Sequence, residues 1–288
     1  MPGHLILVPT PLGNLGDITY RSVQILKECD LVACEDTRRT GKLLAHFNID
    51  KPIMRFDDHA DINTINNFVK ALDRGLTVAY CSDAGMPGIR DPGFELIRIA
   101  RKSHANTTVL PGPSSVTLAL VASGLSNHTF SFWGYLPHRS EPRKSLLCKL
   151  MTKEETVIVF ETGHRIHATL SELTEIAPDR EIALGRELTK LHETWYRGTP
   201  LDVTQQLGTE NRGELVLVIA GTNAKRTIIE QIALQNDNND KLPTWALHYI
   251  KAAREGGMTI REAIKPLAKH MKINPSELYR LAITQRQN

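Results

Sequence analysis

The 288-residue sequence contains few cysteines and no long hydrophobic run. Its four cysteines are widely scattered, with no CxxC pair among them: Cys29, Cys34, Cys81 and Cys148. This spacing favours buried thiols in a reducing compartment over disulfides or a zinc site. No apolar stretch is long enough to span a bilayer, and the N-terminus lacks the features of a secretory signal peptide. We therefore expect a cytoplasmic protein with no membrane partner.

Several ligand-binding motifs are also missing from the sequence. The absence of GxGxxG and of a GKS or GKT motif disfavours a dinucleotide or a nucleoside triphosphate as ligand. No group of His, Cys, Asp and Glu has the spacing of metal ligands, so we expect no metal site. No serine or cysteine lies in a recognisable nucleophile elbow.

The charge of the chain is unevenly distributed. From Lys241 to the end there are nine Lys or Arg against three Asp or Glu, whereas the preceding residues hold 26 basic and 29 acidic side chains. A solvated helical surface is one explanation for the basic tail. A phosphate-rich partner such as a nucleic acid is the more informative one.

The first half of the chain has the pattern of an α/β domain. Short apolar runs predict strands at residues 4–8, 31–34, 76–81 and 108–110. Helical spacing predicts helices at residues 20–29 and 115–122, with Asp17 or Thr19 capping the first and Ser114 the second. Strands that alternate with helices indicate a mostly parallel sheet.

The second half repeats this alternation and is followed by a helical tail. Strands are predicted at residues 130–134, 156–160, 182–186, 193–196 and 215–220, and helices at 143–151, 166–176 and 204–207. The close spacing of the third and fourth of these strands predicts an antiparallel pair, and so a mixed sheet. Beyond the polar residues 235–240, three short helices at 244–255, 260–270 and 275–284 resemble a helix-turn-helix module.

These patterns predict two α/β domains and a small C-terminal helical module. We place the first domain at residues 1–123, the second at 124–222, a linker at 223–240 and the basic, RNA-binding module at 241–288. In open α/β sheets, ligands bind outside the carboxyl ends of the strands, so we expect a ligand site at the edge where the strands end.

Unusual loops follow the predicted strands at that edge, at residues 9–14, 35–38, 82–93, 111–115, 161–165 and 186–187. Each loop alone is explained by ordinary turn chemistry, but six at one edge favour a binding site. The loop 82–93 reads SDAGMPGIRDPG. Its glycines permit left-handed backbone or close approach to a ligand, while its prolines stiffen the path; a rigid structural loop is the alternative.

Five motifs together resemble the tetrapyrrole-methylase superfamily over residues 4–222: VPTPLGNLGDIT, EDTR, SDAGMPGIRDPG, LPGPSS and GELVLV. The PTPLGNL start and the RELTK at Arg186–Lys190 resemble the branch that methylates ribosomal RNA, as does the basic helical tail. The resemblance implies transfer of a methyl group from S-adenosylmethionine to the ribose 2′-hydroxyl of a cytidine. The implied substrate is the decoding region of 16S rRNA in the small ribosomal subunit, and the implied assembly is a homodimer.

The resemblance also implies a cofactor cleft between the two α/β domains. The implied cofactor-binding positions are Pro11, Asp83, Ala84, Gly85, Met86, Ile89, Ser114, Ser115, Phe160 and Leu184. The sequence departs from the expected pattern at Met86-Pro87, where Thr-Pro is usual, and at Gly88, where a bulkier residue is common. The motif ETGHR stands where ESxHR is expected, which keeps a hydroxyl at that position.

A ribose hydroxyl is a weak nucleophile, so a positioned base should assist the transfer. Asp36 or Glu35 is the expected base, with Glu161 as second choice; an ion pair of Glu35 or Asp36 with Arg38 that merely ties the sheet edge is the alternative. Arg38, Arg165, Arg186 and Lys190 are expected to hold RNA phosphates.

Two other functions fit the same motifs. One is methylation of a small tetrapyrrole, against which the basic tail and a cluster of Arg139, Arg143, Lys144 and Lys149 argue. The other is a non-catalytic RNA-binding assembly factor, against which the intact set of loops argues.

Overall fold

The computed structural model describes residues 2–210, 212–222, 242, 244–255, 257–271 and 274–284. The chain divides into two compact units, Met1–Ala224 and Lys225–Asn288. The predicted linker at 223–240 lies outside the described residues. Within the described ranges, no helix has both the length and the apolar character needed to cross a membrane.

The first sheet of the larger unit is wholly parallel, as the strand–helix alternation predicts. Its strands are β1 (His4–Val8), β2 (Leu31–Cys34), β3 (Ile53–Arg55), β4 (Thr77–Cys81) and β5 (Asn106–Val109), in the order β3-β2-β4-β1-β5. Because side chains alternate along a strand, Leu5 and Leu7 enter one core while Ile6 and Val8 enter the other. Burial of each such side chain stabilises the fold by about 1.5–3 kcal/mol.

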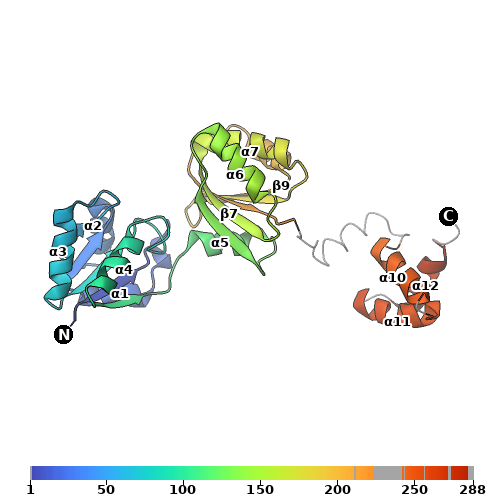
Figure 1. Ribbon diagram of the computed structural model, residues 1–288, viewed down its shortest axis with the longest axis horizontal. Helices are drawn as coiled ribbons and strands as arrows, with labels where there is room; N and C mark the ends of the chain where they lie inside the picture. The colour runs from blue at the N-terminus through green and yellow to red at the C-terminus, as the bar shows by residue number, and fades with distance from the viewer. Residues whose placement is uncertain are drawn as a thin grey trace. The chain divides into compact units, whose positions relative to one another are not determined.

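Helices cover both faces of this sheet (Figure 1). Side chains of α1 (Tyr20–Glu28) and α2 (Thr37–His46) pack in the Ile6 core, and those of α3 (Ile62–Asp73) and α4 (Gly93–Lys102) pack in the Leu5 core. Thr19, rather than Asp17, caps α1 by accepting a hydrogen bond from the Ser22 N–H.

The sequence pattern does not predict β3, α2, α3 or α4. β3 is three residues long and mostly exposed at the edge of the sheet, so its sequence has no run of apolar residues that would predict a strand. α2 contains Gly41 and several charged residues, and α3 is rich in asparagine. Their stability comes from packing one face against the sheet rather than from intrinsic helix propensity.

The second sheet is mixed. It contains β6 (Phe130–Tyr135), β7 (Thr156–Thr162), β8 (Ile182–Arg186), β9 (Thr194–Gly198) and β10 (Glu214–Ile219), in the order β6-β7-β10-β8-β9. β6 and β7 are parallel, and the remaining pairs are antiparallel. The predicted antiparallel pairing of β8 with β9 is confirmed.

The two faces of the second sheet are covered by different helices (Figure 1). α6 (Ser140–Leu150), α7 (Gly163–Ile176) and α8 (Pro200–Leu207) pack on one face, and α5 (Ser115–Ser123) packs on the other. The sequence pattern assigns this helix to the first domain, but its Val116, Ala119 and Leu120 contact the second sheet. Ser114 occupies the N-cap position of α5 without the predicted side-chain hydrogen bond.

Two further expectations about α6 need correction. Cys29, Cys34 and Cys81 are buried as predicted, but Cys148 lies on the exposed face of α6. Arg143 is also not part of an exposed basic cluster, because it is buried in a bidentate ion pair with Glu172, with both N···O distances 2.8 Å. Its charge is neutralised inside the fold and is not available to RNA.

The smaller unit contains α10 (Thr244–Glu255), α11 (Ile260–Met271) and α12 (Pro275–Thr284). The three helices pack around an apolar core that includes Ile250, Leu267 and Leu278. On the exposed side of α11, Arg261, Lys265 and Lys269 recur every four residues and so form a basic stripe along one face.

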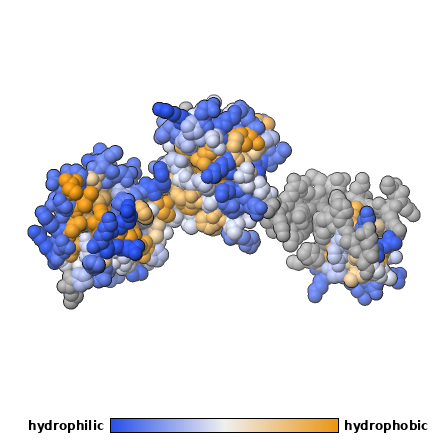
Figure 2. All heavy atoms as spheres, in the orientation of Figure 1, coloured by the Kyte–Doolittle hydropathy of each residue, from blue (hydrophilic) through white to orange (hydrophobic). Residues whose placement is uncertain are grey.

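Polar side chains cover most of the visible surface of both α/β domains, with apolar patches between them (Figure 2). The exposed apolar side chains include Ile62 and Phe94 on the first domain and Leu191 on the second.

Candidate functional site

Backbone pairing fastens the loop after β1 to the loop after β4. Thr10 and Gly85 exchange two N–H···O=C hydrogen bonds, each 3.0 Å long. The Thr10 hydroxyl donates to the Ser82 carbonyl at 3.1 Å, and the Ser82 hydroxyl donates to the Gly85 carbonyl at 2.9 Å. These bonds fix the shape of the loop at the carboxyl edge of the parallel sheet.

Gly85 is required by this arrangement. Its φ of +83° lies in the left-handed region that side chains disfavour, and a Cβ there would lie 2.7 Å from Cδ2 of Leu12. Gly85 therefore shapes the loop through its backbone.

Asp91 organises the far end of the same loop. Its carboxylate accepts hydrogen bonds from the Gly88 N–H at 2.9 Å, from the Gly93 N–H at 2.7 Å and from the Tyr80 hydroxyl at 3.3 Å. All three donors lie beside the start of α4, so the loop is anchored to that helix.

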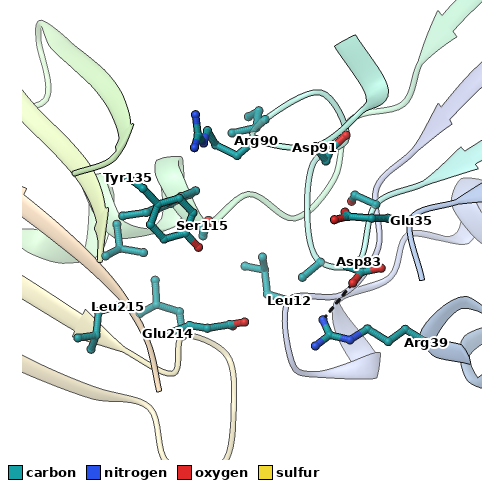
Figure 3. Close-up of a pocket in the computed structure, with 16 residues that line it drawn as sticks. Leu12, Glu35, Arg39, Asp83, Arg90, Asp91, Ser115, Tyr135, Glu214 and Leu215 are labelled. Carbon is teal, nitrogen blue, oxygen red and sulfur yellow. Dashed lines mark ion pairs between the residues drawn. The ribbon is translucent and has the colours of Figure 1, made fainter. Parts of the chain in front are cut away.

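Asp83 connects the loop after β4 to the loop after β2. One of its carboxylate oxygens accepts a hydrogen bond from the Asp36 N–H at 3.0 Å, and the other lies 3.4 Å from Nη1 of Arg39 (Figure 3). The ends of β1, β2 and β4 are therefore joined in one network, as expected for a site at the edge of a parallel sheet.

The two neighbouring acids after β2 have different environments. The Asp36 carboxylate accepts hydrogen bonds from the Arg38 side chain and backbone, which hold its pKa well below the usual range and cap α2. The Glu35 carboxylate makes no hydrogen bond or ion pair with any described residue. Burial, together with the negative charges of Asp83 and Asp91, raises the pKa of Glu35.

A cleft within the larger unit is lined by these loops and by residues of both α/β domains (Figure 3). The first domain and α5 contribute Leu12, Glu35, Arg39, Ser82, Asp83, Ala84, Ile89, Arg90, Asp91 and Ser115. The second domain contributes Tyr135, Phe160, Leu188, Glu214, Leu215 and Val216. The Phe160 ring packs edge to face on Tyr135, with 5.4 Å between centroids, and makes an aromatic wall.

The cleft contains half of the predicted cofactor positions, which are Asp83, Ala84, Ile89, Ser115 and Phe160. Pro11 lines an adjoining hollow that also includes Asp83. Gly85, Met86 and Ser114 belong to the loops that border the cleft without lining it. Leu184 is placed differently, because its side chain is fully buried in the core on the opposite face of the second sheet.

Glu161 is a buried structural carboxylate in this arrangement. Its oxygens accept hydrogen bonds from the Thr162 N–H, the Arg165 Nε–H and the Thr169 hydroxyl, at 2.7–2.9 Å. Arg165 also donates to the Leu136 carbonyl at 3.0 Å. The pair therefore ties β7 to α7, and Glu161 has no contact with the cleft.

The four residues predicted to bind phosphate are each paired with a carboxylate of the protein. Arg38 is exposed but pairs with Asp36, and Arg186 pairs with Glu210 at 3.1 Å. Lys190 lies 3.1 Å from a carboxylate oxygen of both Glu187 and Glu214. Arg165, Arg186 and Lys190 are thus partly buried, and each lies beside a carboxylate.

Several cleft residues are not singled out by sequence reasoning: Leu12, Arg39, Arg90, Tyr135, Leu188 and Glu214. Leu12, Arg90 and Glu214 stand inside motifs that the sequence makes conspicuous, but the motif alone does not show which side chains face a cleft. Tyr135 lies at the end of β6, where a bulge shifts the register. That irregularity is not readable from the sequence.

The loop after β8 carries unusual backbone. Glu187 and Thr189 both have positive φ, at +53° and +65°, which is rare for residues other than glycine. The Thr189 hydroxyl is, among the described residues, the one buried side-chain polar atom that lacks a hydrogen-bond partner. The described residues contain no cluster of three or more side chains arranged to hold a metal ion.

Comparison with known proteins adds to this geometry. The family model of the tetrapyrrole (corrin/porphyrin) methylases matches residues 4–203. The ribosomal RNA small subunit methyltransferase I of Synechocystis sp. is 38% identical over 285 residues, covering 98% of each chain. The protein of the same name from Vibrio cholerae is 44% identical over 222 residues, covering 75% of this chain and 77% of its own.

The fold is similar to that of solved methyltransferases. The crystal structure of uroporphyrin-III C-methyltransferase from Thermus thermophilus has a TM-score of 0.55 and 18% identity, covering 78% of this chain and 96% of that one. A structure of the same enzyme in complex with S-adenosylhomocysteine has a TM-score of 0.52 and 18% identity, covering 75% and 97% of the two chains.

Proposed function

This chain belongs to the tetrapyrrole methylase family, alongside ribosomal RNA small subunit methyltransferase I, and on that premise we propose that it methylates ribosomal RNA with S-adenosylmethionine. In the finer form of the proposal, the acceptor is the ribose 2′-hydroxyl of a cytidine in the decoding region of 16S rRNA. The small ribosomal subunit is then the cytoplasmic substrate, and the family resemblance suggests a homodimer.

The main support for the proposal is the cleft. On one side lie the hydrogen-bonded loops after β1, β2 and β4, and on the other lie the aromatic rings of Tyr135 and Phe160. Its charged residues suit S-adenosylmethionine, which bears a positive sulfonium. The carboxylates of Glu35, Asp83, Asp91 and Glu214 outnumber the guanidinium groups of Arg39 and Arg90. The apolar faces of Tyr135 and Phe160 offer a surface for a flat purine ring.

S-adenosylmethionine, when bound, supplies an electrophilic methyl group on a charged sulfur. Asp83 would hold the loops after β2 and β4 in register around it. Ala84, Ile89 and Phe160 would contact it from the two domains. Alignment of the reacting groups is expected to provide the largest part of the rate acceleration.

Glu35 is the residue best placed to assist the acceptor hydroxyl. It lines the cleft, no described residue neutralises it, and its raised pKa brings its basicity closer to neutral pH. Its carboxylate would accept the hydroxyl proton while the ribose oxygen forms its bond to the methyl carbon and the sulfur–carbon bond breaks. Asp36, the other predicted base, is engaged with Arg38, and Glu161 is enclosed by its three donors.

The basic stripe on α11 supports an RNA substrate. Arg261, Lys265 and Lys269 present three cations along one exposed helix face, which suits consecutive phosphates of a nucleic acid. A small tetrapyrrole substrate gives no reason for such a surface.

The test is methyl transfer from labelled S-adenosylmethionine to small ribosomal subunits from a strain that lacks this protein. We expect one methyl group on the ribose of one cytidine, mapped by mass spectrometry of nuclease fragments. Subunits from the parent strain are the control and should accept no further methyl group. A methylated base, or transfer to a tetrapyrrole and not to RNA, would contradict the proposal. Cofactor binding without transfer to any RNA would favour a non-catalytic assembly factor.

A further inference from the structure

Arg90 lies in the loop between β4 and α4, and its exposed side chain lines the cleft. Its Cζ atom is 5.6 Å from the centroid of the Tyr135 ring. Figure 3 shows the side chain of Arg90 extending from its loop towards Tyr135 of the second domain. A side chain that belongs to the first domain therefore contacts an aromatic ring of the second domain at the cleft.

No carboxylate neutralises this guanidinium within the described residues. The adjacent Asp91 is committed to the Gly88 and Gly93 N–H groups and to the Tyr80 hydroxyl. The other arginine of the cleft, Arg39, pairs with Asp83. Arg90 is thus the cleft cation that remains available to an external anion.

Arg90 combines a costly backbone conformation with a neighbouring glycine that leaves space for its side chain. Arg90 has φ +67°, a left-handed conformation that a side chain with a Cβ adopts at an energetic cost. Gly134 leaves space for the arginine stem, because a Cβ at Gly134 would lie 3.1 Å from the Arg90 Cδ atom. Unfavourable backbone that surrounding contacts maintain is concentrated at ligand-binding sites.

The negative charge of the cleft suggests a function for the guanidinium of Arg90. Glu35, Asp83, Asp91 and Glu214 line the same cleft and would repel the phosphates of an approaching RNA. The 2′-hydroxyl of a ribose is adjacent to its 3′-phosphate. That phosphate must therefore come close to these carboxylates if the hydroxyl is to react.

We propose that Arg90 binds the RNA phosphate next to the reacting ribose and so positions the 2′-hydroxyl in the acidic cleft. The planar guanidinium can donate two parallel hydrogen bonds to a phosphate, which fixes orientation as well as distance. This inference rests on the proposed function and adds a residue that recognises the acceptor strand.

The test compares Arg90→Asn, Arg90→Lys and the wild-type protein. Asparagine tolerates the left-handed backbone and removes the charge, whereas lysine keeps the charge and loses the planar fork. Arg98→Gln is the matched control, because Arg98 is an exposed arginine on nearby α4 that pairs with Glu95 and does not line the cleft. Arg90→Gly is a second charge-removing variant that suits the same backbone.

Binding to small ribosomal subunits is measured across salt concentrations, together with cofactor affinity by calorimetry and melting temperature. For Arg90→Asn we expect about tenfold weaker subunit binding and a log–log salt slope reduced by roughly 0.7–0.9, the value of one phosphate contact. Cofactor affinity and melting temperature should change little. Arg90→Lys should recover the salt slope, and Arg98→Gln should resemble the wild type.

Unchanged subunit affinity and salt slope in both Arg90→Asn and Arg90→Gly would overturn the inference. So would a loss confined to cofactor affinity, which would assign Arg90 to the cofactor carboxylate, or a fall in melting temperature with no binding change. If the wild-type protein neither binds the cofactor nor methylates subunits, the proposed function itself is wrong. That outcome is distinct from failure at Arg90 alone.

Discussion

The Asp83 carboxylate accepts a hydrogen bond from the Asp36 backbone N–H at 3.0 Å and so holds the ends of β4 and β2 together. The same carboxylate lies 3.4 Å from Arg39, on the cleft side of α2. Removing the Asp83 oxygens would break the hydrogen bond with the Asp36 N–H, whereas removing only the charge would weaken the attraction to Arg39.

Asp83→Ala should therefore separate the two loops. The lost hydrogen bond should lower the free energy of unfolding by about 1–2 kcal/mol. Cofactor affinity should fall in parallel, because Asp83 also lines the cleft. Asp83→Asn keeps an acceptor for the Asp36 N–H and should recover most of the stability. Calorimetry and thermal melting check both variants; full cofactor affinity in the alanine variant would remove Asp83 from the site.

Glu35 and Asp36 should respond differently to neutral substitution. Glu35→Gln should slow single-turnover methyl transfer to small subunits by about 10²–10⁴-fold, the usual effect of losing a general base. Asp36→Asn should leave the transfer rate nearly unchanged and lower the melting temperature only slightly, because asparagine still caps α2 and loses only the charge that pairs with Arg38. The reverse pattern would assign the base to Asp36.

The raised pKa of Glu35 predicts a pH dependence. Transfer should fall on the acidic side through a pKa above the ordinary glutamate value, because the protonated acid cannot accept a proton. Since the folded-state pKa is raised, the contribution of Glu35 to stability is greatest below its unfolded pKa. It is lost as pH rises through the folded pKa.

Glu35→Gln should consequently stabilise the fold relative to the wild type more at neutral pH than at acidic pH. Melting temperatures across that range, together with kcat/KM profiles, provide the measurement. A profile centred at or below the ordinary glutamate pKa would contradict the assignment.

Gly85→Ala tests the loop after β4. The added Cβ meets Leu12 as well as an unfavourable φ, so the Thr10 pairing and cofactor binding should both be lost. Gly208→Ala is the matched control, because Gly208 has φ +61° with no atom within 4 Å of an added Cβ. Both substitutions should lower the stability, because each places a Cβ on a backbone with positive φ. Cofactor affinity measured by calorimetry should change only in Gly85→Ala; equal affinities would exclude this loop from the site.

The helical module is predicted to contribute RNA affinity and not cofactor affinity. Truncation after Asp240 should leave cofactor binding intact, weaken subunit binding and flatten its salt dependence. Replacing Arg261, Lys265 and Lys269 by glutamine should reproduce much of this effect while leaving the apolar core of the module unchanged. Equal subunit affinity with and without the module, at every salt concentration, would reduce it to a folding or dimerisation element.

The amino-acid sequence by itself determined the main strands of both sheets and the loops that follow them. Apolar runs bounded by turn residues mark β1, β2 and β4, and the loop after β4 contains Asp83 and Ala84, which line the cleft. These features are local, because strand propensity and turn chemistry depend on residues that are close in the chain.

Tertiary structure alone decided which of these residues face one another. Chain order puts α5 after the first sheet, but burial of its apolar side chains puts it on the second. Glu35 and Asp36 are equivalent in the sequence; only the Arg38 contact and the surrounding carboxylates distinguish their charges. The sequence offers Glu161 as a base and Arg165 as a phosphate ligand, yet in the fold the two side chains neutralise each other. Whether a charge is free or neutralised depends on neighbours distant in the chain, and the sequence pattern does not contain that information.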